Sequence, residues 1–225
     1  MNQHENLITA IVPVRKEKRR LKNKNTLPFG SSNLLLHKLQ QLKKVKRIDQ
    51  IVVSSEDDEI LKTANSVDVI TIKRPPEFAD QNIPFGYFVE HICNQVSSEH
   101  ILWACVTAPF IEAEMYEEAI DLYLNKLEDG YDSLISVHKL KRFILDANGS
   151  VNFKRGLQHR NSEDLPSLFL YTNGIVLAPR EKMIEWKYNW GHVPYMFEVD
   201  KKAGLDISDY YDYHIACLLN QEEAT

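Results

Sequence analysis

Cysteine is scarce in this chain of 225 residues, and the few that occur are far apart. Cys93, Cys105 and Cys217 form no C-x-x-C pair, and no histidine stands near them at ligand spacing. Zinc modules need such closely spaced ligands, and disulfide frameworks typically contain an even number of cysteines, whereas this chain has three. We therefore expect reduced, mostly packed thiols and neither kind of scaffold.

Long apolar runs near the N-terminus are also missing. The first apolar stretch, at residues 7–14, is short and ends in charge at Arg15 and Lys16. A signal peptide or a membrane span needs a longer uninterrupted run. We expect a cytoplasmic protein that does not enter a membrane.

Positive charge is in deficit overall but concentrated at one place. The chain has 27 Lys and Arg against 32 Asp and Glu. Seven of the ten residues from Arg15 to Lys24, called here the basic segment, are Lys or Arg. A general nucleic-acid binder is basic over its whole domain, and the basic segment contains no aromatic side chain. Phosphates of a small molecule therefore explain the segment better than a nucleic acid does.

Strand-length apolar runs alternate with helical patterns in the first part of the chain. This alternation predicts an α/β fold, with a parallel sheet covered by helices on both faces. A chain of this length fits one such domain over residues 1–225. The expected strands are 7–13, 50–55, 67–72, 100–107 and 132–137, and the expected helices include 84–97 and 114–128.

The alternation fades after about residue 138. The turn residues Asp146, Asn148 and Gly149 predict a hairpin, and we expect a small excursion from the domain at about 138–170. A further strand is expected at 167–179, interrupted at Asn173–Gly174. The C-terminus returns to a helical pattern that places Tyr211, Ile215, Leu218 and Leu219 on one face.

The basic segment directly follows the first expected strand. Ligands of open parallel sheets bind at the carboxyl ends of the strands, so a loop here would cover a binding crevice. The sequence of the segment and its surroundings, "PVRKEKRRLKNKN" at 13–25, resembles P-A-R-G-G-S-K-R-I-P-x-K-N, the opening motif of the acylneuraminate cytidylyltransferases, or CMP-sialic acid synthetases. Five positions match outright: Pro13, Arg15, Arg20, Lys24 and Asn25.

Further partial matches to this family follow in the same order along the chain. They are "VVSSEDDEI" at 52–60, "RPPEFAD" at 74–80, "VTAPFI" at 106–111, "SEDLP" at 162–166 with "TNG" at 172–174, and "GLDISDYYDYHIA" at 204–216. Several ordered matches over most of a chain are more specific than any one motif.

The resemblance implies a Rossmann-like, mostly parallel sheet with a hairpin excursion that mediates dimerisation. It also implies a nucleotidyltransferase that moves CMP from CTP to the anomeric hydroxyl of a sialic-acid-like 2-keto acid sugar. Pyrophosphate leaves, and Mg²⁺ assists. The expected partners are CTP, an acidic sugar and a second copy of the chain.

The resemblance assigns roles to individual residues. Arg15, Arg19 and Lys24 would hold the triphosphate as catalytic cations, and Asn25 would help to position the nucleotide. Arg74 would contact the pyrimidine, or else form a surface ion pair with Glu77. Thr107 would face the nucleotide, or else be a buried turn hydroxyl. Lys16, Lys18 and Lys22 have no matched counterpart and are expected to be solvated surface charges.

The expected metal ligand is Asp206, with Asp209 as a second carboxylate because Ser208 stands where the family has Asp. Ser208 or Asp209 could equally cap the helix that follows, and Asp212 is expected to be structural. The expected contacts with the sugar are Arg160, Asn173 and Gly174.

The chain departs from the family pattern at several positions. Lys16 and Glu17 replace a Gly pair, Cys105 replaces Gln, and Ile111 replaces Arg. These departures leave open a second possibility, a catalytically degenerate nucleotide-binding or regulatory protein on the same fold.

Overall fold

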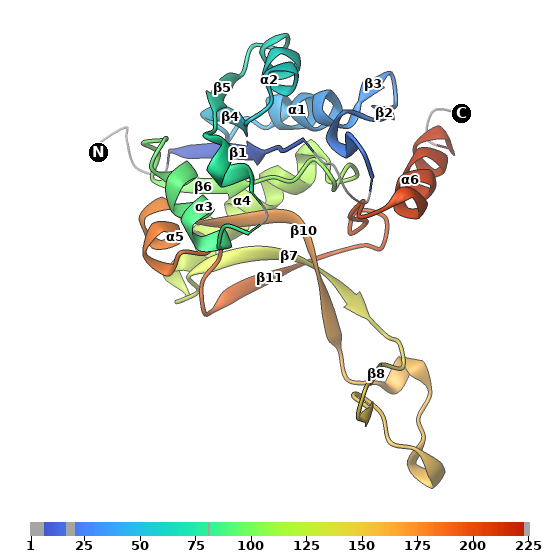
Figure 1. The fold of residues 1–225 in the computed structure, drawn as a ribbon. Coiled ribbons are helices and arrows are strands. Elements are labelled where there is room, and N and C mark those ends of the chain that lie inside the picture. Colours follow the sequence, from blue (N-terminus) through green and yellow to red (C-terminus); the bar gives the residue numbers. More distant parts are fainter. Residues whose placement is uncertain (1–6, 17–20, 81, 223–225) are drawn as a thin grey trace.

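A computed structural model describes residues 7–16, 21–80 and 82–222. Its centre is a seven-stranded sheet with the strand order β11-β7-β10-β6-β1-β4-β5 (Figure 1). In chain order these strands are β1 (Ile8–Pro13), β4 (Gln50–Ser55), β5 (Ile70–Lys73), β6 (His100–Trp103), β7 (Ser133–Leu140), β10 (Leu168–Pro179) and β11 (Pro194–Val199). The expected α/β class with a mostly parallel sheet is confirmed.

Only β10 among these strands runs antiparallel to its neighbours, β6 and β7. The reason is its connection: β10 follows β7 through a long hairpin, so the chain returns along β7 in the opposite direction. The two strands β7 and β10 continue beyond the sheet into the arm, defined here as residues 141–167, which projects from the body (Figure 1). Within the arm, β8 (Leu145–Asp146) and β9 (Gly149–Ser150) form a short hairpin at the turn residues that the sequence indicates.

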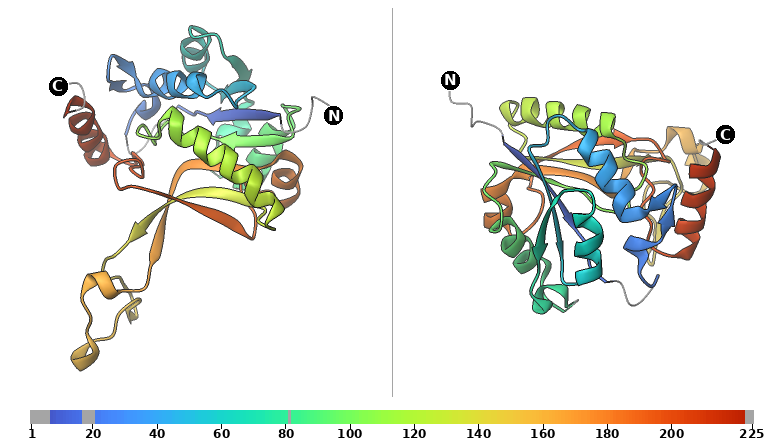
Figure 2. Two further views of the ribbon diagram at one scale, coloured as in Figure 1. Left: turned by 180° about the vertical axis from the view of Figure 1, so that it is seen from behind. Right: turned by 90° about the horizontal axis from the view of Figure 1, so that it is seen from above.

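Helices cover both faces of the sheet (Figure 2). One face carries α1 (Leu34–Lys44), α2 (Asp58–Asn65) and α4 (Ala113–Glu128), and the other carries α3 (Phe85–Cys93) and α5 (Arg180–Trp186). The last helix, α6 (Tyr210–Glu222), lies beside the small hairpin of β2 (Pro28–Phe29) and β3 (Ser32–Asn33), and its Tyr213 hydroxyl donates to the Pro28 carbonyl at 2.6 Å. Single turns of 3-10 helix occur at η1 (Lys24–Thr26), η2 (Pro76–Ala79), η3 (Gly156–Gln158) and η4 (Ser162–Asp164).

The central strand β1 is buried on both sides. Val12 packs into the core under α1, α2 and α4, while Ile11 packs into the core under α3 and α5. This double burial explains why the strand is a continuous apolar run without polar alternation. Among the described helices, none combines the length and apolarity that crossing a bilayer requires.

Two expectations need correction. The run 100–107 forms a strand only as far as Trp103, because the chain then leaves the sheet to line a crevice. The face expected for α6 is confirmed only in part: Leu219 packs against the core together with Tyr213, Ala216 and Cys217, whereas Tyr211 and Leu218 are exposed. A helix at the margin of the fold buries a narrow stripe, which apolar periodicity alone does not locate.

Candidate active site

A crevice of about 650 Å³ opens at the carboxyl ends of β1 and β6. These adjacent strands connect onward in opposite directions across the sheet, to β4 on one side and toward β10 and β7 on the other. Such a switch point is where open α/β sheets bind ligands. Among the residues that the sequence indicates for the site, Arg15, Lys24, Asn25, Arg74, Thr107, Asn173 and Asp206 all line this crevice.

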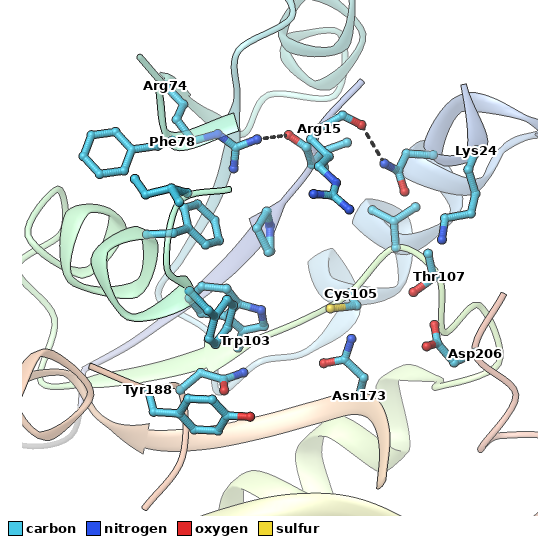
Figure 3. A pocket seen from close by; sticks show the side chains of 18 of the residues that line it. Arg15, Lys24, Arg74, Phe78, Trp103, Cys105, Thr107, Asn173, Tyr188 and Asp206 are labelled. Carbon is cyan, nitrogen blue, oxygen red and sulfur yellow. Dashed lines mark hydrogen bonds between the residues drawn. The ribbon is translucent and has the colours of Figure 1, made fainter. Parts of the chain in front are cut away.

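Arg15 and Lys24 form one rim of the crevice (Figure 3). The side-chain amide of Asn25 donates to the Arg15 carbonyl at 2.9 Å, which ties the end of the basic segment to its beginning. Lys24 donates from Nζ to the Ile207 carbonyl at 2.9 Å. Arg19, the third expected catalytic cation, lies outside the described residues. The rim therefore offers two cations: the backbone of Arg15 and the ammonium of Lys24 are each fixed by a hydrogen bond.

Lys16 points away from this rim and forms an ion pair with Asp57 at 2.7 Å. Its side chain is about half exposed (49%), and the hydrogen bond to Asp57 raises its pKa. Asp57 also caps the first turn of α2, where it accepts from the amides of Glu59 and Ile60. Lys16 thus helps to fix the loop from outside the crevice.

Arg74 is buried, with 3% of its surface exposed, and is fully oriented by its neighbours. Its guanidinium donates to the Val14 carbonyl at 2.8 Å and to Glu56 at 2.7 Å, and lies 4.9 Å from the ring centre of Phe88. The alternative surface pair with Glu77 is not formed; the partner is Glu56. Since Arg74 Nε is buried and unpaired, one donor remains at the wall of the crevice.

The aromatic rings around Arg74 complete this end of the crevice. Phe78 stacks on His91 with ring centres 3.9 Å apart, and both Phe78 and Phe88 line the crevice beside Arg74. Trp103 and Tyr188 continue the aromatic wall (Figure 3). This wall is suited to planar groups, and the sequence gives no sign of Tyr188 because no motif contains it.

Asp206 lies opposite Lys24, next to Thr107 (Figure 3). Its Oδ1 atom is buried and has no hydrogen-bond partner. Burial raises the pKa of Asp206, although the Thr107 hydroxyl and the Lys24 ammonium act in the other direction. The backbone nearby is fixed, because the Ile207 amide donates to the Thr107 carbonyl at 2.8 Å. An unpaired buried carboxylate oxygen that faces a crevice is an available ligand for a hard cation.

The surroundings of Asp206 fit Mg²⁺ bound together with phosphates. In the described part of the chain, no group of three His, Cys, Asp or Glu residues could hold a metal by itself. Mg²⁺ is commonly held by one or two carboxylates plus phosphate oxygens of the substrate and retains water ligands. The donor set therefore fits a metal that arrives with a nucleotide.

Of the two roles expected for Asp209, metal ligand or helix cap, the structure shows the cap. The Asp209 carboxylate accepts from the amides of Tyr211 and Asp212 at 2.8 and 3.1 Å, and Asp212 accepts in return from the Asp209 amide. This reciprocal arrangement is a capping box at the start of α6. Asp209 does not line the crevice, so the structure places only Asp206 of the two candidate ligands there.

Asn173 lies at an irregularity of β10, where the register with β7 shifts between Tyr171 and Val176. It has a positive φ of 55°, and its Oδ1 accepts from the Tyr171 hydroxyl at 3.0 Å. Cys105 is close by and also lines the crevice, and burial raises the pKa of its thiol to about 12. We call residues 172–175 the bulge.

Gly174 and Arg160 do not line the crevice. Gly174 allows the Ile111 side chain to pack closely on the backbone of β10, because a Cβ atom at Gly174 would lie 2.8 Å from Cγ1 of Ile111. Arg160 is in the arm and lines a separate cavity with Phe153, Leu157 and Pro166. The expected sugar contact from Arg160 is therefore not made within one chain.

Comparisons with known proteins show the family of the chain. A family model described as cytidylyltransferase matches residues 9–158. The chain belongs to the cytidylyltransferase family. The matched region begins in β1, includes the basic segment and the loop after β6, and ends within the arm. Asn173 and Asp206 lie beyond it.

One curated relative is the N-acylneuraminate cytidylyltransferase of Escherichia coli O18:K1:H7, which is 24% identical over 227 aligned residues. The alignment covers 96% of this chain and 52% of that protein, so the chain spans about half the length of this relative. The expected family resemblance is confirmed.

Solved structures show the same fold. One is a CMP:2-keto-3-deoxy-manno-octonic acid synthetase complexed with CTP, with a TM-score of 0.72 at 13% identity, covering 96% of this chain and 99% of that one. Another is the 4-diphosphocytidyl-2C-methyl-D-erythritol synthase of Anaerococcus prevotii, with a TM-score of 0.66 at 13% identity and the same coverage.

Proposed function

We propose that this cytidylyltransferase transfers CMP from CTP to the anomeric hydroxyl of a sialic-acid-like 2-keto acid sugar and releases pyrophosphate. The observation that carries the proposal is the arrangement of the crevice. Two cations, Arg15 and Lys24, and a buried carboxylate, Asp206, line the same crevice of about 650 Å³, in which we place the triphosphate. The relative from Escherichia coli, named for N-acylneuraminate, supports the choice of acceptor.

The reaction places demands that these residues meet. The acceptor oxygen forms a bond to the α-phosphorus while the bond to the pyrophosphate oxygen breaks. Negative charge develops on the phosphoryl oxygens and on the leaving group, and preorganised cations stabilise it most strongly in the transition state. Arg15 and Lys24 supply such cations. The side-chain amide of Asn25 holds the Arg15 backbone in position by donating to the Arg15 carbonyl.

The opposite ends of the crevice suit the two substrates. Arg74, with Phe78 and Phe88, forms a rigid, partly aromatic wall for the nucleotide base. Asn173 offers an amide to the hydroxyl groups of the acceptor, and the Tyr171 hydroxyl, which donates to Asn173 Oδ1, lines the crevice beside it. Asp206 would hold Mg²⁺ through its unpaired oxygen, and the ion would neutralise and orient the phosphates.

We further propose that the protein is a homodimer joined through the arm. The arm exposes apolar side chains, including Leu145, Val151 and Leu157, that are not covered by its own chain. Contiguous exposed apolar surface on a soluble protein typically marks an interaction site.

The decisive test is release of pyrophosphate by the purified protein with CTP, Mg²⁺ and a panel of 2-keto acid sugars. Release that depends on one sugar is the expected result. CTP turnover without any acceptor dependence, or with UTP in equal measure, would contradict the proposal.

The second candidate is a nucleotide-binding protein without turnover. The observation that favours it is that Asp209 caps α6, which leaves Asp206 as the only proposed metal carboxylate placed in the crevice. Calorimetry separates the two functions. Tight binding of CTP with no pyrophosphate release from any sugar of the panel would support the second.

A further inference from the structure

A lysine and a tyrosine are buried together beneath the crevice. Lys38 of α1 and Tyr116 of α4 each have 0% of their surface exposed. Lys38 Nζ donates to the Tyr116 hydroxyl at 2.9 Å and lies 3.4 Å from the Ile111 carbonyl. The Tyr116 hydroxyl in turn donates to the Gly174 carbonyl at 3.3 Å. The pair thus connects two backbone segments that are far apart in sequence.

Burial of this lysine is costly. Desolvation lowers the pKa of Lys38 to about 7, and the thiol of Cys105 is the group that opposes this change. No ion pair within the described part of the chain relieves the cost, which an aliphatic side chain would avoid. Packing alone therefore does not account for a lysine at this position, whereas its hydrogen bonds do.

Both connected segments carry residues of the crevice. Ile111 belongs to the loop after β6, which contains Cys105 and Thr107, and Gly174 belongs to the bulge, next to Asn173. Neither Lys38 nor Tyr116 lines the crevice itself. Lys38 and Tyr116 can therefore affect the crevice only indirectly, by fixing the two segments that carry Thr107 and Asn173.

The bulge needs such support because its backbone is strained. Asn173 has a φ of 55°, a left-handed conformation that asparagine tolerates better than most residues but that still costs energy compared with the right-handed or extended regions. On one side, Ser136 of β7 holds the bulge by accepting from the Ile175 amide at 2.8 Å and by its hydrogen bond with Thr172 at 2.7 Å. On the other side, Tyr116 holds the Gly174 carbonyl.

We infer that Lys38 and Tyr116 are positioning residues for the acceptor: their hydrogen bond holds the bulge with Asn173 at a fixed distance from the loop with Thr107. This inference rests on the proposed function, because it takes Asn173 as a contact of the acceptor. It predicts that loss of the pair affects the acceptor more than the nucleotide, since Arg15, Lys24 and Arg74 are held by other contacts.

The chain offers a matched pair of substitutions. Tyr116 and Tyr123 are both buried in α4, and each uses its hydroxyl in a buried hydrogen bond. The partner of Tyr123 is His100, at 2.8 Å, which lies at the start of β6 and so at the other end of the sheet from the crevice. Tyr116→Phe and Tyr123→Phe therefore remove the same group from the same helix, but only the first lies beneath the crevice.

Kinetics with CTP and the acceptor is the first measurement. Tyr116→Phe should raise KM for the acceptor about tenfold, with KM for CTP changed less than about twofold, and Tyr123→Phe should leave both nearly unchanged. Lys38→Met, which keeps the length of the side chain but removes the donors, should reproduce the effect of Tyr116→Phe. Equal effects of the two tyrosine variants, or a rise in KM for CTP alone, would overturn the inference.

Hydrogen exchange of the backbone amides is the second measurement, and it does not require turnover. Tyr116→Phe should speed exchange in residues 172–176 more than Tyr123→Phe does, because the bulge loses a restraint. Unchanged exchange there would overturn the inference. A wild-type protein without acceptor-dependent turnover would instead contradict the proposed function, so the two failures remain distinct.

Discussion

The side-chain amide of Asn25 bonds to the carbonyl oxygen of Arg15 across 2.9 Å and joins the two ends of the basic segment. Asn25 is expected to help position the nucleotide, and we propose that it acts through this contact with the loop backbone. Asn25 and Arg15 both line the crevice, so the backbone of Arg15, a proposed phosphate-binding cation, is held in place by Asn25.

We predict that Asn25→Ala weakens the binding of CTP about tenfold, because Arg15 loses the hydrogen bond that orients its backbone. Calorimetric titration with CTP and Mg²⁺ measures the change. Lys22→Ala is the matched control, since it removes an exposed charge of the same segment that does not line the crevice. A loss of affinity in Lys22→Ala as large as that in Asn25→Ala would point to general charge attraction.

The ion pair of Glu56 and Arg74 should make stability depend on acid pH. Burial raises the pKa of Glu56, but hydrogen bonds from Arg74 and from the Lys16 amide outweigh this effect and leave it below its ordinary value of 4.5. A carboxyl group with a lowered pKa in the folded state stabilises that state above the unfolded pKa, and the contribution is lost as the pH falls through the folded pKa.

Glu56→Gln should therefore lower the free energy of unfolding at neutral pH by about 3 kcal/mol, and it should reduce the loss of stability below about pH 4.5. Urea unfolding at both pH values measures this. The control is Asp58→Asn, because Asp58 is largely exposed (85%) in its pair with Lys73 and should change stability by less than about 1 kcal/mol. Parallel acid profiles of wild type and Glu56→Gln would refute the assignment.

Substitution of Asp206 should affect mainly catalysis, whereas substitution of Asp209 should affect mainly stability. Asp206→Asn removes the charge of the proposed Mg²⁺ ligand and should lower kcat by at least about 100-fold while the protein stays folded. Asp209→Ala removes the cap of α6 and should cost about 1 kcal/mol of stability, with kcat reduced only a few-fold. Pyrophosphate release over a range of Mg²⁺ concentrations, together with thermal unfolding, tests both. Loss of activity in Asp209→Ala alone would restore Asp209 as a metal ligand.

The sequence predicts the centre of the fold better than its margins. Strands such as β1 and β4 are buried on both faces, so their apolar runs are unambiguous and their bounds agree with the expectation. The direction of β10 depends on how the chain returns from the arm, which local periodicity does not encode. The packed face of α6 depends on contacts with residues near Pro28, about 185 positions away in sequence.

The sequence likewise predicts some residues of the candidate site and misses others. Arg15, Lys24 and Asp206 belong to motifs with a recognisable order, and all three line the crevice. Lys38 and Tyr116 belong to no motif and look like ordinary helix residues, because their role depends on backbone carbonyls contributed by distant segments. Such partners become visible only when the chain is folded.

The exposed residues of the arm allow a test of the proposed dimer. Leu157 is fully exposed and lies beside the cavity formed by Val151, Phe153 and Pro166. When a second copy covers an exposed apolar side chain, its burial stabilises the dimer, by about 2 kcal/mol for a leucine. A charge at the same position would have to be desolvated instead, so the dimer should dissociate.

Leu157→Asp should therefore be monomeric at concentrations at which the wild type is a dimer, as measured by light scattering coupled to size-exclusion chromatography. Its affinity for CTP should not change, because the described lining of the crevice includes no residue of the arm. Leu218→Asp is the matched control, since Leu218 is 46% exposed on α6, away from the arm. A variant at Leu157 that stays dimeric, while Leu218→Asp dissociates, would move the interface from the arm to α6.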